Sequence, residues 1–434
     1  MTIQAGPISI FNVREHGATG DGRTLDSRAI QKAIDSCAAQ GGGTVYLPAG
    51  EYHTGGLFLR SNITFYLDAG AVIRGSENPE DCPAIHSRWE GMHQDTHAPL
   101  LGGDHLHNIA VIGRGTIDGR GAVWWKAKQE MTLAHPRPRL ISFSHCSNVL
   151  IEGVTAVNSP SWTVNPIHCQ NVNIRGITII NPADSPNTDG INPDSCRLVR
   201  ISDCYISVGD DCITIKSGNE HEHPDRSAPC RDITITNCTL ERGHGGVVIG
   251  SEMSGGVKNV VISNCVFIGT DRGIRIKSRR GRGGTIEDIR VSNLIMDGVL
   301  CPFTMNLYYH IGERGNLDVS DKNPRLVDHG TPRLRHIHFS HVTAREVKHA
   351  AGFLYGLAEM PLEDISLSDI SISISDEADS GYPEMGDDFP SMSQAGFFIR
   401  NARCLRLEHV QVTGQRGPVF DIDDSTDVEI IPPP

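Results

Sequence analysis

A short unit recurs along the middle of this chain, and it restricts the possible folds more than any other feature. Each copy opens with a polar residue and continues with alternating branched apolar residues, as in NVLIEGVTAV, NVNIRGITII and NVVISNCVFI. The first apolar residues of six such units are Val149, Val172, Val199, Ile233, Val260 and Ile289, at spacings of 23, 27, 34, 27 and 29 residues. Spacings of this size are typical of one coil in a solenoid.

The alternation within each unit indicates strands with one buried and one outward face, and branched side chains suit strands. The units lack helical periodicity and the Leu-and-Asn consensus of a leucine-rich repeat. The pairs Asp203-Cys204, Asn237-Cys238 and Asn264-Cys265 fall at the same place in three successive units. We therefore expect an all-β fold, a parallel β-helix, with stacked cysteines inside it.

One helix is expected near the start, where Asp26 can cap an amphipathic segment that the glycines at 41 to 43 end. Its apolar face would consist of Ile30, Ala33, Ile34, Cys37 and Ala38. This helix would cover the N-terminal end of the solenoid, where strand edges and core are otherwise open. We interpret residues 1–434 as a single catalytic domain, with a cap region at 1–75, regular coils at 105–300 and loop-rich coils at 301–434.

Composition excludes several classes of partner. The formal net charge of −13 argues against nucleic acid or an anionic membrane, because both need a basic surface. No apolar stretch is long enough to span a membrane, and the first residues lack the features of a secretory signal. The 12 cysteines contain no CxxC pair and fit reduced core thiols. We expect a cytoplasmic protein without metal or cofactor, or a secreted one if a leader has been removed, and the oligomeric state stays open.

Four short segments on successive coils carry the residues that suggest chemistry: SPNTDG at 185–190, GDD at 209–211, GHG at 243–245 and RIK at 275–277. Residues one coil apart in a parallel solenoid lie about 4.8 Å from each other. Asp189, Asp210 or Asp211, His244 and Arg275 could therefore form one row on one face. Each segment alone is an ordinary turn or strand sequence, and it is the combination at coil intervals that indicates a site.

The ordered set NTDG, GDD, GHG and RIK resembles the signature of the polygalacturonase family, glycoside hydrolase family 28. The phrase GHGGVVIGSEMSGGV and the loop-rich final third look like its exo-acting bacterial members. The resemblance implies a right-handed parallel β-helix and metal-free, inverting hydrolysis of α-1,4-galacturonosyl linkages in pectin or oligogalacturonides. It further implies catalytic roles for Asp189, Asp210, Asp211 and His244, and substrate binding by Arg275 and Lys277.

The residues themselves, apart from the resemblance, are also suited to inverting glycoside hydrolysis. Inverting glycosidases need an acid and a base whose carboxyl groups lie roughly 6.5 to 9.5 Å apart. We assign the acid to Asp210, water activation to Asp189 and Asp211, and a hydrogen bond with Asp210 to His244. Crowded carboxylates should raise the pKa of one member. Because neighbouring strand residues point to opposite faces, a bend at Gly209 is needed for both members of the acidic pair to reach one cleft.

Arg275 and Lys277 stand two apart on a strand, so they point to the same face. Both can pair with a galacturonate carboxylate, the arginine in bidentate fashion. Four more arginines surround them, at 272, 279, 280 and 282. They are either the local basic patch that an acidic protein needs to bind a polyanion or a solvated loop.

Several other aromatic residues and histidines give weaker indications of function. Trp124, Trp125 and Trp162 are expected to pack more than to stack on sugars, and Tyr308 and Tyr309 resemble a substrate-side tyrosine only loosely. Histidines 86, 93, 97, 105 and 107 are too irregularly spaced for a metal site. Open alternatives are a rhamnogalacturonan or xylogalacturonan hydrolase, a calcium-dependent pectate lyase, and a non-catalytic carbohydrate-binding β-helix.

Overall fold

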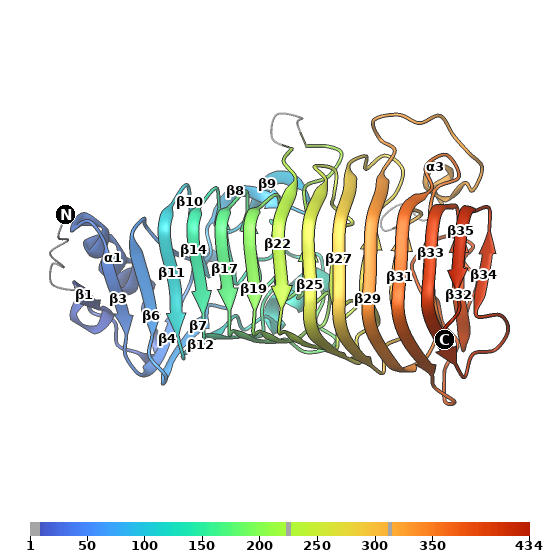
Figure 1. The fold of residues 1–434 in the computed structure, drawn as a ribbon. Coiled ribbons are helices and arrows are strands. Elements are labelled where there is room, and N and C mark those ends of the chain that lie inside the picture. Colours follow the sequence, from blue (N-terminus) through green and yellow to red (C-terminus); the bar gives the residue numbers. More distant parts are fainter. Residues whose placement is uncertain (1–8, 223–226, 311–314) are drawn as a thin grey trace, which may run out of the picture.

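The computed structural model describes residues 9–222, 227–310 and 315–434. Strands of successive coils lie side by side from the N-terminal to the C-terminal end of an elongated solenoid (Figure 1). Neighbouring coils pair in parallel. The predicted right-handed parallel β-helix is confirmed.

Most strands belong to one 22-stranded sheet, called here the long sheet. Its members are β1 (Ile10–Asn12), β2 (Asp21–Leu25), β3 (Gly43–Leu47), β4 (Gly50–Thr54), β6 (Ile63–Leu67), β7 (Ala71–Gly75), β11 (His107–Gly113), β12 (Thr116–Asp118), β14 (Ser147–Glu152), β15 (Thr155–Val157), β17 (Gln170–Arg175), β18 (Thr178–Ile180), β19 (Arg197–Ser202), β20 (Tyr205–Ser207), β22 (Cys230–Thr236), β23 (Thr239–Glu241), β25 (Val257–Ile268), β27 (Thr285–Asp297), β29 (Arg333–Val347), β31 (Leu362–Ile374), β33 (Ala402–Thr413) and β35 (Thr426–Ile431).

The opposite side of the coils forms two further sheets, called here the short sheets. The first contains β5 (Leu57–Phe58), β10 (Leu101–Asp104), β13 (Ile141–Ser144) and β16 (Val164–Ile167). The second contains β21 (Ile213–Ile215), β24 (Val247–Ile249), β26 (Arg272–Lys277), β28 (Cys301–Asn306), β30 (Ala350–Tyr355), β32 (Ala395–Arg400) and β34 (Phe420–Asp423). An antiparallel hairpin, β8 (Ala84–Trp89) and β9 (Met92–His97), stands apart from both.

The register of the long sheet follows the sequence period. Each anchor residue pairs with the anchor of the next coil, from Val149 through Val172 to Ile289. The same row continues through Ile337 and Ile365 into coils whose repeat is weaker in the sequence. Stacking therefore holds the chain in register even where loops lengthen the coil.

The predicted cysteine ladder is present. Cys204, Cys238 and Cys265 are all buried in the core. The polar residue before each has a positive φ of 55 to 57°, and the Asn237 side-chain amide donates to Asp203 at 3.3 Å. Asn and Asp tolerate this left-handed conformation better than other residues with a side chain, which explains their choice at the turn.

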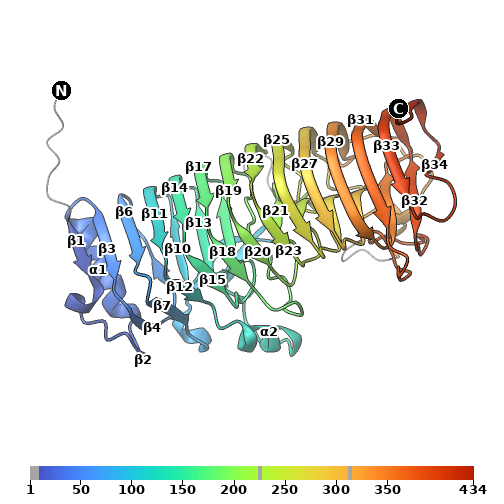
Figure 2. The same ribbon diagram turned by 60° about the horizontal axis from the view of Figure 1, so that its bottom comes forward.

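Helix α1 (Ser27–Ala39) covers the N-terminal end of the core, as predicted (Figure 1). The predicted side-chain cap was wrong, because the Asp26 carboxylate instead accepts hydrogen bonds from the backbone of Thr19 and Gly20. A second helix, α2 (Ala122–Gln129), was not predicted and stands off one side of the solenoid (Figure 2). The short α3 (Leu317–Ser320) and the 3-10 turns η1 (Val13–His16) and η2 (Pro79–Asp81) are the other helical segments of the described residues. Among the described residues, no helix has the length and apolarity needed to cross a membrane.

Candidate active site

The six residues singled out in the sequence all line one pocket of about 590 Å³ on the short-sheet side. They are Asp189, Asp210, Asp211, His244, Arg275 and Lys277. The pocket lies at the junction of the two short sheets, where the coil at 191–194 joins its neighbours only through isolated bridges. Pro193 contributes to this break, because proline has no N–H to donate to the ladder.

Asp189 and Asp211 come from adjacent coils that stack directly. The Gly190 amide donates to the Asp211 carbonyl at 3.0 Å, and the Thr163 amide donates to the Asp189 carbonyl at 2.8 Å. The Asp189 side chain accepts from Asn192 at 3.0 Å and is almost fully buried. Backbone stacking thus fixes one carboxylate above the other.

Asp210 occupies the predicted bend. Residues 209 and 210 form a bend between β20 and β21, so both members of the acidic pair reach the pocket. His244 lies on the next coil, and its Nδ1 is 3.2 Å from Asp210 Oδ1. Gly243 makes this approach possible, because it has a positive φ of 108° and a Cβ there would lie 2.4 Å from the Asp210 carbonyl oxygen.

The three carboxylates form one electrostatic unit. An oxygen of each lies within 4.8 Å of the others, which is shorter than the expected 6.5 to 9.5 Å because coil stacking sets the separation. Burial and the charge of Asp210 hold the pKa of Asp189 well above its usual range. Burial also opposes ionisation of Asp211, but Lys277 and Arg275 outweigh it and hold its pKa well below the usual range. The predicted raised pKa therefore falls on Asp189.

The two predicted substrate cations share a face of β26, but both have partners within the protein. Arg275 makes a bidentate pair with Glu384, with distances of 2.8 Å from Nε and 2.5 Å from a terminal nitrogen. Lys277 Nζ lies 2.8 Å from Asp211 Oδ2. Glu384, from a segment 109 residues away, therefore already occupies the guanidinium, and the predicted bidentate contact of Arg275 with a sugar carboxylate stays a prediction.

The flanking arginines do not make the pocket basic. Arg272, Arg279 and Arg282 line it, whereas Arg280 pairs with Glu359 away from it. Glu220 contacts both Arg279 and Arg282. In all, six cations and seven carboxylates line the pocket, so the expected basic patch is instead a network of opposite charges.

Lys216 is a pocket residue that sequence reasoning missed. Its Nζ lies 2.8 Å from Glu252 and 4.9 Å from the Trp162 ring centroid. The signal was present, because ITIK at 213–216 has the same pattern as IRIK at 274–277. The two lysines occupy the same register two coils apart, since Ile215 pairs with Ile249 and Ile249 with Ile276.

Aromatic residues divide between pocket and core. Trp162 lines the pocket and stacks on Trp89 at 5.5 Å, whereas Trp124 packs against His97 and Trp125 lies outside the pocket lining. Tyr309 lines the pocket, with its ring centroid 5.3 Å from Lys277 Nζ. Tyr308 faces the core side, against Lys322 and Tyr355.

Two elements far from the catalytic coils wall the pocket. The tip of the β8–β9 hairpin contributes Glu90 and Met92, and the loop before β32 contributes Met385. The hairpin is held in place because the Asn219 side chain donates to the Glu90 carbonyl at 2.9 Å. Neither wall was predicted, because both depend on contacts between segments that the repeat does not describe.

Several groups of His, Asp and Glu side chains lie close enough together to hold a metal ion. Within the described residues, one such group is the pocket's own carboxylate cluster of Asp189, Asp210 and Asp211, where Lys277 and Arg275 already supply positive charge beside Asp211. Another contains His93, whose irregular spacing from the neighbouring histidines argued against a metal site, together with His168 and Glu222. Its partners come from distant segments, so spacing along the chain could not have found them.

Comparison with known proteins agrees with this geometry. Residues 44–382 match the family described as "Glycosyl hydrolases family 28". A "Probable polygalacturonase" of Vitis vinifera is 35% identical over 393 residues, which cover 87% of this chain and 78% of that protein. An "Endo-polygalacturonase" of Pectobacterium carotovorum subsp. carotovorum is 31% identical, over 67% of this chain and 74% of that protein. The crystal structure of a hyperthermoactive exopolygalacturonase from Thermotoga maritima has a TM-score of 0.81 at 29% identity, covering 95% of this chain and 93% of that one.

Proposed function

The chain belongs to glycosyl hydrolases family 28, a family of inverting enzymes, and on that premise we propose that it removes single galacturonate units from the ends of pectic chains. It is a pectin-degrading glycoside hydrolase, so the lyase and non-catalytic alternatives are set aside. The α-1,4-galacturonosyl linkage of polygalacturonate or its oligomers is the proposed bond. Rhamnogalacturonan and xylogalacturonan linkages are the alternatives within the same family.

The proposed acid is Asp210. It is the most accessible of the three carboxylates, with 19% of its side chain exposed, and His244 lies beside it. A carboxylic acid at this position can protonate the leaving oxygen as the glycosidic bond breaks. The hydrogen bond with Asp210 raises the pKa of His244, so the imidazole is suited to hold and orient this carboxyl.

The proposed base is the stacked pair Asp189 and Asp211. Asp211 stays ionised because Lys277 and Arg275 stabilise its charge. Asp189 retains a proton more readily, because it is buried beside two other carboxylates. Their oxygens lie close enough for one water to contact both, and that water would attack the anomeric carbon from the face opposite the acid. The proton that the water releases would then stay within the carboxylate cluster.

Recognition of the uronate carboxylate is assigned to Lys277, with Arg275 behind it. Because Glu384 holds the Arg275 fork, Arg275 is proposed chiefly to stabilise the ionised Asp211 and to position β26. Lys277 has three donors and uses one on Asp211, so it can contact a sugar carboxylate at the same time.

One observation carries the proposal of exo action: the hairpin tip stands in the pocket that contains the catalytic carboxylates. Glu90 and Met92 line this pocket together with Asp189 and Asp210. An internal stretch of a polysaccharide needs a groove that continues on both sides of the cleaved bond, whereas a chain end needs only a pocket. The wall formed by the hairpin favours the chain end.

A time course of products from polygalacturonate tests this proposal. We expect monomer as the sole early product, and a ladder of oligomers at low conversion would refute exo action. The variant Glu90→Gly/Met92→Gly, which trims the wall and leaves the buried Trp89 in place, should release some longer products. An Asp95→Gly variant at the exposed base of the same hairpin is the control and should still release monomer.

We also propose a cytoplasmic location. All twelve cysteines are free and only Cys404 is exposed, which suits a reducing compartment. Fractionation of the native organism tests it, and recovery of the enzyme outside the cytoplasm would refute it.

A further inference from the structure

A second cavity, of about 700 Å³, lies on the same side of the solenoid as the catalytic pocket but shares none of its lining residues. The β8–β9 hairpin separates the two, since its tip lines the catalytic pocket and residues 85–88 and 93 line the second cavity. Histidines are prominent in the second lining, which includes His86, His93, His145 and His168. The reaction proposed above uses none of these histidines.

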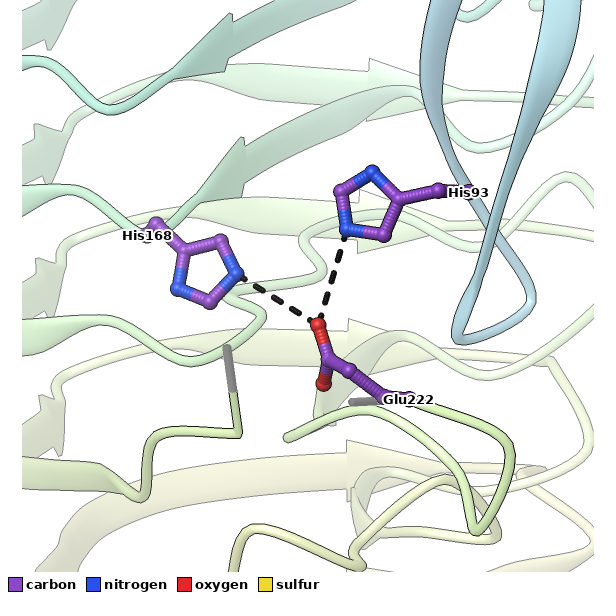
Figure 3. A group of neighbouring side chains, drawn as sticks. All are labelled: His93, His168 and Glu222. Atoms are coloured by element: carbon purple, nitrogen blue, oxygen red, sulfur yellow. Dashed lines mark ion pairs between the residues drawn. The ribbon is translucent and has the colours of Figure 1, made fainter. Parts of the chain in front are cut away.

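Two of these imidazoles converge on a buried carboxylate. His93 Nε2 lies 3.5 Å and His168 Nε2 lies 3.8 Å from Glu222 Oε1, and both rings point toward that oxygen (Figure 3). The three ligand atoms lie within 4.8 Å of one another. Ligands about 2.0 to 2.2 Å from one zinc ion are separated by roughly 3 to 3.5 Å, so a small inward movement would complete the set.

A second observation is that one oxygen of the buried Glu222 carboxylate has no hydrogen-bond partner among the described residues. Its side chain is only 1% exposed, and its Oε2 accepts no hydrogen bond from any residue that the structure describes. A buried carboxylate oxygen without a partner is costly. Rotation about the last side-chain bond exchanges the two oxygens, so either one can face the imidazoles.

The cation already present at this place is Arg88, which forms ion pairs with both Asp194 and Glu222. Arg88 lies 2.7 Å from Asp194 Oδ1 and 2.8 Å from Ser195 Oγ, and it also contacts Glu222. Asp194 therefore shares the neutralisation of the guanidinium with Glu222, and the Oε2 atom of Glu222 keeps its lone pairs for a second cation. The imidazoles can be neutral ligands, because an imidazole coordinates in its neutral form.

We propose that His93, His168 and Glu222 form a binding site for a divalent transition-metal ion, for which Zn²⁺ is the probe. Two imidazoles and one carboxylate are an established zinc ligand set with a fourth position for water, and the adjoining cavity gives that position access to solvent. Calcium and magnesium prefer oxygen ligands and do not fit two nitrogens. The proposal is independent of which pectic linkage the enzyme cleaves.

The site would join three separate segments. His93 belongs to β9, His168 to the turn after β16, and Glu222 to the segment after β21. That last segment also supplies Asn219 and Glu220 to the catalytic pocket. A bound ion would therefore fix the hairpin relative to the segment that carries Asn219 and Glu220.

The test uses the full chain after dialysis against a chelator. Metal content by mass spectrometry and the unfolding temperature are measured with and without Zn²⁺. We expect one tightly bound Zn²⁺ per chain and a rise in Tm of at least about 4 °C when Zn²⁺ is added. Added Ca²⁺ should leave the Tm unchanged. No stoichiometric zinc in the wild-type protein would overturn the proposal.

Variants locate the ion. His93→Ala/His168→Ala should lose the bound zinc and the Tm rise, whereas the control His336→Ala/His341→Ala, which removes two exposed histidines of the long sheet, should keep both. Glu222→Gln keeps the side-chain shape and should weaken zinc binding by at least about 10-fold, so loss of binding does not depend on a variant that misfolds. Zinc retained at wild-type affinity in the double variant or in Glu222→Gln would place the ion elsewhere and contradict the proposal.

Discussion

The two sides of each coil share one alternating pattern but lie in different surroundings. On the long sheet, outward side chains face water, and the Arg175 and Glu152 side chains that pair across neighbouring coils are 49% and 37% exposed. On the short sheets, the outward side chains of β26 lie under loops, and the Arg275 and Glu384 side chains are 3% and 0% exposed. The same kind of arginine–glutamate pair is thus solvated on one side and buried on the other.

This difference is the physical reason for placing the proposed chemistry on the short-sheet side. Charges in water are screened and interact weakly, whereas charges removed from water shift each other's pKa strongly. Because apolar and polar residues alternate along every strand, both the long sheet and the short sheets have a row of outward-pointing side chains. The hairpin and the loop before β32 convert one of these two rows into a site. The predictions below test this contrast.

The largest effect is expected from Asp210→Asn. The amide keeps the shape of the side chain but cannot protonate a leaving oxygen, so kcat should fall by about 10² to 10⁴-fold while substrate still binds. Steady-state rates and calorimetric binding of an oligogalacturonide measure the two quantities. Asp203→Asn, at a turn of the long sheet where the residue has φ of 57°, is the matched control and should retain activity. Wild-type turnover in Asp210→Asn would remove this residue from the acid role.

The next largest effect is expected on stability, when the buried ion pair between Arg275 and Glu384 is broken. Glu384→Gln leaves Arg275 without its charged partner in a buried place, which should cost about 3 to 5 kcal/mol of unfolding free energy. Glu152→Gln removes the same charge from the exposed Arg175 pair and should cost at most about 1 kcal/mol. Urea denaturation of both variants gives the comparison, and equal costs would contradict the contrast between the two sides.

The same pair predicts a pH dependence. Burial would raise the pKa of Glu384, but Arg275 outweighs it and lowers that pKa from 4.5 to about 2. A lowered folded-state pKa gives stability that is fully present above about pH 4.5 and is lost as the pH falls toward 2. Wild-type stability should therefore drop over this window more steeply than that of Glu384→Gln. Parallel curves for the two proteins would show that folding does not lower the pKa of Glu384.

A smaller effect concerns substrate charge. Lys277→Met should lower kcat/KM on polygalacturonate by about 10 to 100-fold more than on its methyl ester, because only the acid loses a charge-assisted contact. Arg275→Leu should reduce both substrates similarly, since Glu384 already occupies the guanidinium. Equal losses on acid and ester in Lys277→Met would make Lys277 a structural partner of Asp211 alone.

The smallest effect is expected on the exposed side. The Asn148 side chain donates to Asn108 at 2.8 Å and accepts from Asn171 at 2.7 Å along the surface of the solenoid. Asn148→Ala should cost about 1 to 2 kcal/mol, from these exposed hydrogen bonds and from the left-handed backbone at φ of 55°. Catalytic rates should not change. A fall in kcat would mean that the long sheet influences the site.

Much of the fold was predictable because every coil has the same alternating strand pattern and pairs with the next coil in the same register. Val149 and its equivalents pair in the register that their spacing predicts. Helix α2 was missed because it is an insertion outside the repeat. The cap at Asp26 was wrong because its carboxylate meets a nearby loop, and the sequence pattern of a cap does not describe such competition.

The site was predictable as a set of residues but not in its electrostatics. Coil spacing brings Asp189, Asp211 and Lys277 together, as the sequence indicates. Glu384 was missed because it comes from an irregular loop, and it changes the expected role of Arg275. His168 and Glu222 were missed for the same reason, since distant loops carry them to His93.

The most direct test is where the substrate binds. Crystals of Asp210→Asn soaked with an oligogalacturonide should show a sugar across Asp189 and Asp211, with a carboxylate within hydrogen-bonding distance of Lys277 and the chain end against Glu90 and Met92. Sugar bound only in the histidine-lined cavity, or on the outward face of the long sheet, would contradict the claim that the loop-covered side of the coils carries out the hydrolysis.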